Sequence, residues 1–143
     1  MKADAKTEAE VLSVLNEWLE RYRERDIDGL MAHVAPDDDL FLFGTGLDEK
    51  RVGPEEFRYQ AERDWSQTEA LAFDFTSHHI SAAGPVAWVA SEGQGRGRVG
   101  GQEIAFPLRM TAVLEQRDDR WLLVQSHVSL PSAAQEEGDS VPV

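Results

Sequence analysis

The sequence predicts an α+β fold in which a curved antiparallel sheet wraps around a long N-terminal helix. The first half of the chain repeats apolar residues at helical spacing, and the second half carries four successive stretches that alternate as strands do. Glycine or paired aspartate residues separate those stretches. Helices segregated from a sequential meander of strands are typical of α+β proteins. At 143 residues, the chain fits one domain, which we place at residues 1–130.

Three helices are expected in the first half of the chain. In the first, apolar residues recur at spacings of three and four, and Thr7 with Glu10 fits a capping box. The second is short and ends before Pro36, and the third begins at Pro54, which suits a first helical turn. We expect these helices over residues 7–24, 28–35 and 54–66.

The strands follow from alternation bounded by turn residues. A short strand over residues 40–43 stops at Gly44, and Asp118 with Asp119 marks the turn of the last hairpin. The four long strands are expected over residues 71–81, 86–98, 103–116 and 120–130. Residues 131–143 are polar and lack periodicity, so we expect a disordered tail.

The last two strands carry an unusual set of polar residues. Because side chains alternate along a strand, Arg109 and Thr111 share one face of the first of them. On the second strand, the face that begins at Trp121 and Leu123 continues with Gln125, His127 and Ser129. If both faces line one pocket, Arg109 binds an anionic oxygen and His127 moves a proton, which makes them the candidate catalytic pair. The alternative is a buried Arg109 paired with an acid and a His127 satisfied by backbone.

Aromatic side chains would complete the wall of such a pocket and suit a flat apolar ligand. The candidates are Trp18, Tyr22, Phe43, Trp65 and Trp88. Each of them taken singly could equally belong to the core. Glu92, on the neighbouring strand, is the acid best placed to pair with Arg109. If that pair forms, the pocket suits apolar ligands, and if it does not, the pocket should capture carboxylates.

Composition excludes several classes of function. The formal net charge of −13 disfavours nucleic acid and anionic membranes as partners. The chain has no cysteine, which excludes thiolate metal sites, and His78 and His79 point to opposite faces of one strand. We expect no metal and no cofactor. No secretory signal and no apolar stretch of roughly 20 residues is present, so a cytoplasmic protein is expected.

A homodimer is also expected. The faces opposite Arg109 and His127 are apolar and too large to leave in water, so self-pairing across the outer side of the sheet would cover them. On the two strands these faces consist of Leu108, Met110, Ala112 and Leu114, and of Leu122, Val124 and Val128.

The pattern resembles the SnoaL-like domains of the nuclear transport factor 2-like superfamily, over residues 8–130. The residues that carry the resemblance are Arg25-Asp-Ile-Asp-Gly-Leu, Leu42-Phe-Gly-Thr-Gly46, Gly53, Arg109-Met-Thr-Ala-Val-Leu and Trp121…His127-Val-Ser129. It implies a cone-shaped α+β barrel of the cystatin-like kind. The closing Trp…His-x-Ser pattern is also similar to the association domain of calmodulin-dependent kinases.

The superfamily hosts many activities, so the resemblance implies a fold more than a function. The positions of the base, the oxyanion tyrosine and the protonated aspartate of ketosteroid isomerases fall here on Gly44, Trp18 and Arg109, which argues against steroid isomerase chemistry. Three interpretations stay open. The favoured one is a small-molecule pocket protein, and the others are a cofactor-independent isomerase, lyase or cyclase acting on an apolar carbonyl compound, and a non-catalytic assembly domain.

Overall fold

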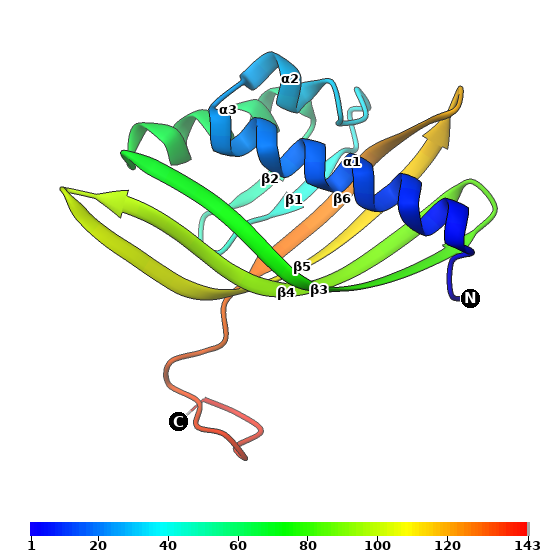
Figure 1. Cartoon of the computed structure of the whole chain (residues 1–143). Coiled ribbons are helices and arrows are strands. Elements are labelled where there is room, and N and C mark those ends of the chain that lie inside the picture. Colours follow the sequence, from blue (N-terminus) through cyan, green and yellow to red (C-terminus); the bar gives the residue numbers. More distant parts are fainter. Residues whose placement is uncertain (143) are drawn as a thin grey trace.

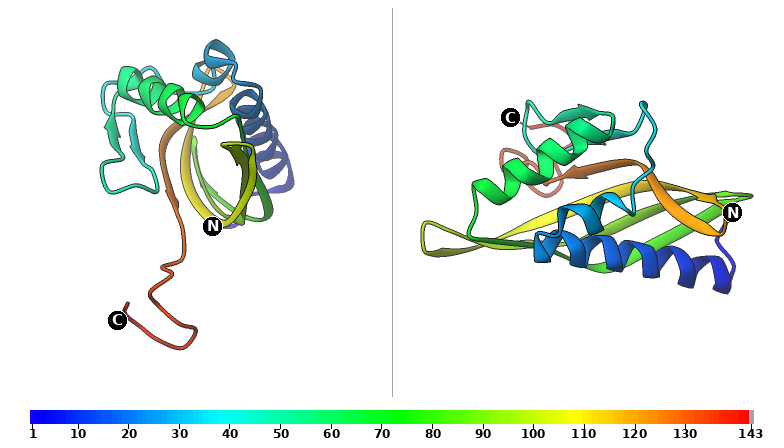
Figure 2. Two further views of the ribbon diagram at one scale, coloured as in Figure 1. Left: turned by 90° about the vertical axis from the view of Figure 1, so that its left-hand side faces the viewer. Right: turned by 90° about the horizontal axis from the view of Figure 1, so that it is seen from above.

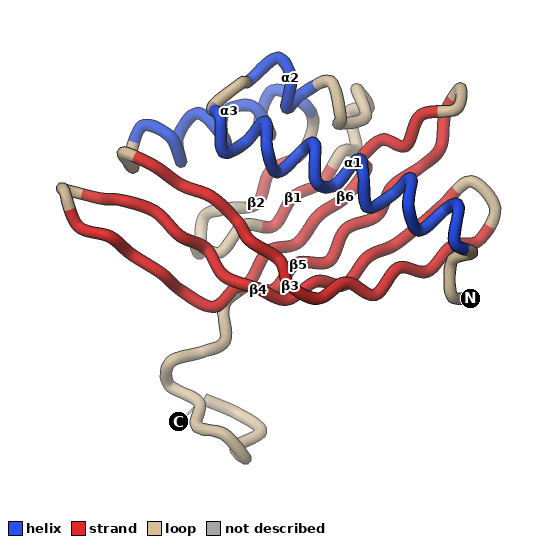
Figure 3. Tube along the Cα trace, in the orientation of Figure 1, coloured by secondary structure: helices blue, strands red, loops and turns tan. Residues whose placement is uncertain are grey.

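The computed structural model describes residues 1–142 and confirms an α+β fold with a curved sheet and a long N-terminal helix (Figure 1). All three helices lie on one side of the sheet (Figure 3). The elements, in chain order, are α1 (Ala5–Glu24), α2 (Ile27–Met31), β1 (Phe41–Phe43), β2 (Lys50–Val52), α3 (Pro54–Ser66), β3 (Ala70–Ala83), β4 (Val86–Val99), β5 (Gln102–Arg117) and β6 (Arg120–Ser129).

The sheet has six strands in the order β2-β1-β6-β5-β4-β3. The expected antiparallel meander of the four long strands is confirmed, and a parallel pairing of β1 with β6 makes the whole sheet mixed. β1 runs parallel to β6, with Phe41 beside Gln125 and Phe43 beside His127. Strands β3 to β6 are joined by short turns and therefore alternate in direction. No turn joins β1 to β6, because α3 and four strands separate them in sequence. Strands joined by a tight turn must run antiparallel, and this constraint therefore does not apply to β1 and β6.

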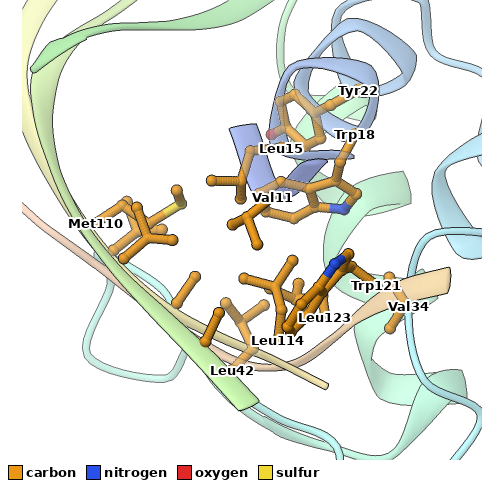
Figure 4. Close-up of a cluster of buried hydrophobic side chains, with 14 of the residues drawn as sticks. Val11, Leu15, Trp18, Tyr22, Val34, Leu42, Met110, Leu114, Trp121 and Leu123 are labelled. Atoms are coloured by element: carbon orange, nitrogen blue, oxygen red, sulfur yellow. The ribbon is translucent and has the colours of Figure 1, made fainter. Parts of the chain in front are cut away.

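α1 lies along the concave side of the sheet (Figures 1 and 2). Its N-cap is Asp4, whose carboxylate accepts a hydrogen bond of 2.8 Å from the Thr7 amide, so the N-cap lies three residues before Thr7, the N-cap of the expected capping box. Figure 4 shows its side chains pointing toward those of β5 and β6. The buried stripe of α1 consists of Val11, Leu15, Trp18 and Tyr22.

A β-bulge decides which residues of β6 face the core. Val113 of β5 pairs with Gln125, whereas the next residue, Leu114, pairs with Leu123, so Val124 is an extra residue in β6. The alternation therefore reverses at Val124. Trp121 and Leu123 point inward before it, and Ser126 and Val128 point inward after it.

The inner face of β5 is the apolar one, and it packs against α1. It consists of Leu108, Met110, Ala112 and Leu114, each at most 2% exposed. These residues and Val128 belong to the core, so the prediction that they form a dimer interface was wrong. We call the opposite side of the sheet, turned away from α1, the outer face.

Residues 131–142 form neither helix nor strand and leave the domain on the side of the sheet away from the helices (Figure 1). No helix within residues 1–142 combines the length and the apolar character needed to span a membrane.

Candidate functional site

A cavity of about 140 Å³ lies between α1, α3 and the inner face of the sheet. Its wall is mostly apolar and aromatic, and its polar side chains come from α1, from α3 and from the segment that links β1 to β2. The apolar part of the lining consists of Trp18, Leu19, Leu30, Leu42, Phe57, Ala61, Leu71, Phe73, Phe106, Leu108 and Val128. A concave apolar site with a few converging polar groups is typical of small-molecule pockets.

Four polar side chains meet at this cavity. The Tyr22 hydroxyl donates a hydrogen bond of 2.6 Å to Oδ2 of Asp64. The Gln60 amide Nε2 donates to Oδ1 of Asp64 at 2.7 Å and to Oε1 of Glu49 at 3.0 Å. Each carboxylate oxygen of Asp64 thus has one protein donor, which leaves acceptor capacity for a ligand, since each oxygen can accept two.

The helical period of α3 turns its polar residues inward. Phe57, Gln60, Ala61 and Asp64 follow the i, i+3, i+4, i+7 pattern of a single helix face, and Gln60 is 4% exposed. The helix begins after Gly53, whose φ of 86° is a conformation that favours glycine. A single stripe therefore supplies both the packing against α1 and the polar groups of the site.

Glu49 lies at the edge of the cluster and is held from three sides. Besides Gln60, it accepts hydrogen bonds from the backbone amide of Gly46 at 2.6 Å and from Arg63 at 3.3 Å. Arg63 also pairs with Asp48. Within residues 1–142, no group of three or more His, Cys, Asp or Glu side chains is arranged to hold a metal ion.

The protonation properties of the Tyr22–Asp64 pair depart from those in water. Burial raises the pKa of Asp64, although the hydrogen bonds from Tyr22 and Gln60 oppose that shift. Burial and the negative charge of Asp64 raise the pKa of Tyr22, which keeps its proton throughout the physiological range. Asp64 is therefore a stronger base than an exposed aspartate, and Tyr22 stays a hydrogen-bond donor.

Two aromatic rings flank Tyr22. Phe73 stacks on it with ring centroids 4.9 Å apart, and Trp65 packs at 5.6 Å. Trp18 lies one turn earlier on α1 and is 7% exposed. Among the described residues, no acceptor reaches its buried indole Nε1, which therefore has an unused donor beside the cavity.

The structure places the residues predicted for the site on two different sides of the sheet. Trp18 and Tyr22 line the cavity, and Trp65 packs behind Tyr22. The remaining predicted residues lie on the outer face or along its rim: Phe43, Trp88, Glu92, Arg109, Thr111, Gln125, His127 and Ser129. The prediction that Arg109 and His127 share a cavity with Trp18 and Tyr22 was wrong. Any role for the outer-face residues in binding or catalysis stays a prediction.

Two physical reasons explain this outcome. The bulge at Val124 rotates Gln125 and His127 to the side opposite Trp121, which period-two counting cannot anticipate. On β5, the apolar residues beside Arg109 are the ones that pack under α1, and the exposed guanidinium needs no buried acid. Glu92 stands opposite Arg109 in the register, but no ion pair joins them within the part of the chain that is described.

Gln60, Asp64 and Glu49 were not predicted as site residues. The sequence did contain a signal for the first two, because they share the helical stripe of Phe57 and Ala61, and polar residues in an apolar stripe indicate either a buried network or a site. Glu49 had no such signal. It reaches the cluster through the turn after β1, where Gly44 and Gly46 leave room for its side chain.

Comparison with known proteins adds a family and a fold. Residues 11–133 match the profile of the SnoaL-like domain family. No curated protein matches the chain.

Several solved structures share the fold at low sequence identity. A candidate dehydratase of the NTF2-like family from Streptomyces avermitilis is 21% identical, with a TM-score of 0.80 over 91% of this chain and 100% of that chain. A candidate calcium/calmodulin-dependent protein kinase II association domain from Xanthomonas campestris is 20% identical, with a TM-score of 0.78 over 92% and 95%. A cystatin-like protein of unknown function from Nostoc punctiforme is 14% identical, with a TM-score of 0.76 over 93% and 97%.

Proposed function

The chain belongs to the SnoaL-like domain family, and we propose that it binds a small, uncharged, largely apolar molecule in the cavity beneath α1. The observation that carries this proposal is the Tyr22–Asp64 hydrogen bond at the wall of a mostly apolar cavity. A polar pair in such a wall fixes the orientation of a ligand, while the aromatic lining supplies most of the buried area.

The charge of the lining favours a neutral ligand over a carboxylate. The ionisable groups among the described lining residues are Tyr22, Glu49 and Asp64, and none of the lining residues is Lys, Arg or His. A carboxylate would lose its hydration in the cavity without gaining a cation, whereas a carbonyl or hydroxyl group can bond to Tyr22 or Asp64. The carboxylate ligand expected for a pocket built on Arg109 is therefore not supported.

The same pair favours a second, catalytic function, which is proton transfer on a carbonyl compound without a cofactor. A ligand carbonyl that accepts the Tyr22 hydroxyl hydrogen displaces Asp64 as its acceptor. The released Asp64 carboxylate then removes a proton from the carbon next to the carbonyl, and the electron pair moves onto the oxygen that Tyr22 stabilises. Return of the proton to another carbon gives isomerisation, and loss of a leaving group from the adjacent carbon gives elimination.

Hydrogen exchange of a simple ketone tests both functions. Cyclohexanone in D2O with the full chain should bind, as seen by saturation-transfer NMR, and should exchange its α-protons faster than in buffer. Asp64→Asn should lower the protein-dependent exchange rate by about 100-fold or more, because it removes the base. The outer-face variant Glu92→Gln is the matched control and should leave the rate unchanged.

The outcomes separate the two functions. If neither cyclohexanone nor a panel of uncharged one-ring compounds binds, the cavity is not a ligand site. If cyclohexanone binds and its exchange is equal in wild type and Asp64→Asn, the catalytic function is rejected while binding stands.

We also propose a homodimer, formed by the outer face of the sheet and not by the apolar face of β5, which is buried in the core. Phe43 is 42% exposed on the outer face, and its ring lies 5.2 Å from that of His127. Trp88 of β4 is half-buried on the same face. Exposed aromatic side chains on a broad sheet are suited to self-association. If the protein is a non-catalytic assembly domain, this face would form the contact and the cavity would have no role.

A further inference from the structure

Gly95 of β4 and Phe106 of β5 stand directly opposite each other in the antiparallel register. Gly95 is buried, and Phe106 lines the cavity. A Cβ atom at position 95 would overlap the phenyl ring, because Cε1 of Phe106 would lie 3.0 Å away and its Cζ and Cε2 atoms nearer still. The ring of Phe106 thus occupies the space that any side chain at position 95 would need.

We propose that Gly95 sets the size of ligand that the cavity accepts, by letting the Phe106 ring lie back against the sheet. This inference rests on the proposed binding function and adds the residue pair that governs its selectivity. Phe106 and Leu108 project from the same face of β5, and both line the cavity. A ring lifted off Gly95 therefore moves into the space beneath α1 that the ligand would fill.

The two neighbouring glycines of β4 have a different role. A Cβ atom at Gly97 would meet the backbone oxygen of Ala70 at 2.5 Å, and one at Gly93 would overlap backbone atoms of Asp74 and Phe75. These glycines let β3 approach β4, and a side chain there would have to move a strand. At Gly95 the obstacle is the far end of a side chain, which can turn about its own torsions. A side chain at position 95 would therefore change the cavity, whereas a side chain at position 93 or 97 would displace β3.

Because the cavity is small, the position of the Phe106 ring over Gly95 determines how large a ligand can fit. An apolar cavity of about 150 Å³ holds one benzene molecule, and the cavity here measures about 140 Å³. A displaced phenyl ring would remove a large part of that space. The substrate class that follows is a one-ring compound, with Phe106 as the residue that limits binding of a second fused ring.

The test compares cyclohexanone with the fused two-ring ketone 2-tetralone, with dissociation constants measured by NMR titration of the full chain. Gly95→Ala should weaken the binding of 2-tetralone by at least about tenfold more than it weakens the binding of cyclohexanone. Phe106→Ala should shift the preference the other way, toward 2-tetralone, by a similar factor. The double variant Gly95→Ala with Phe106→Leu should recover part of the lost 2-tetralone binding, since the shorter side chain clears the new methyl group.

A second readout follows the ring itself and needs no ligand. In the wild type, nuclear Overhauser contacts should join the Phe106 ring to the Gly95 α-protons. In Gly95→Ala, the contacts of the ring to position 95 should weaken, and contacts to Leu19, across the cavity, should appear. Circular dichroism establishes that each variant is folded, and Phe106→Ala carries the test if Gly95→Ala does not fold.

The failures are distinguishable. Wild-type protein that binds no uncharged one-ring probe overturns the proposed binding function. Wild-type protein that binds, with the same ratio of the two affinities in Gly95→Ala and Phe106→Ala, overturns the size role of this pair and leaves the binding function intact. An unmoved ring in the folded Gly95→Ala variant also overturns it.

Discussion

The hydroxyl group of Tyr22 donates a hydrogen bond of 2.6 Å to Asp64, which joins α1 to α3 across 42 residues of sequence. The contact has a structural and a chemical consequence. It ties the two helices that cover the concave side of the sheet, and it sets a proton donor against a basic carboxylate at the cavity wall. A change at either residue should therefore alter both stability and the proposed chemistry.

Tyr22→Phe should lower the free energy of unfolding by about 2 kcal/mol, because it removes the hydrogen bond from a buried hydroxyl to a carboxylate. Urea denaturation followed by fluorescence measures the change. Tyr59→Phe is the matched control, since Tyr59 is 53% exposed and should lose almost nothing. Equal stabilities of Tyr22→Phe and wild type would show that this contact does not hold α3 on α1.

Asp64 should make stability depend on pH in a defined direction. Burial raises its pKa above the ordinary 3.8, so between the two values the folded state binds more protons than the unfolded chain. The stability that Asp64 contributes is complete below the ordinary value and is lost as pH rises through the folded value. The unfolding free energy of Asp64→Asn relative to wild type should therefore increase from about pH 4 to about pH 7. A constant difference across urea denaturations at these pH values would contradict the raised pKa.

The outer face should carry the dimer contact. Phe43→Glu should convert a dimer to a monomer at micromolar concentration, as measured by light scattering, because a buried unpaired carboxylate opposes association. Val99→Glu is the control, since Val99 is similarly exposed but stands at the far tip of β4. Met110→Asp should instead unfold the protein, because Met110 is 2% exposed in the core. A wild-type monomer would reject the dimer.

Removal of the tail after Pro131 should leave the melting temperature within about 2 °C of the full chain. The hydrogen bonds of the described tail residues are internal to it, as between Gln135 and Asp139. Differential scanning calorimetry of the truncated chain checks this. A loss of many degrees would show that the tail packs on the domain.

The sequence alone predicted most of the fold, because hydrophobic periodicity distinguishes helices from strands and locates them along the chain. The helices at α1 and α3 and the four long strands lie where their patterns indicated. β2 was not predicted. Its three residues carry too little pattern, and its pairing with β1 depends on the turn between them.

The sequence also identified Trp18 and Tyr22 as candidate walls of a pocket, because helical spacing makes them neighbours on the buried stripe of α1. It could not decide which side of the last two strands faces α1. Both faces of those strands carry residues that could be buried. On β6, a single extra residue at Val124 exchanges the faces, and on β5, packing of the apolar residues under α1 decides which face is inner. The bulge places His127 on the outer face, and the packing of β5 places Arg109 there.

Composition and periodicity by themselves thus determined an acidic α+β domain with a helix across a curved sheet, since these properties depend on residues close in sequence. Only the tertiary structure decided the site. Tyr22, Glu49 and Asp64 come from α1, from the turn before β2 and from α3, and their meeting depends on how those elements pack. Contacts between distant segments are set by packing and register, which no local pattern in the sequence encodes.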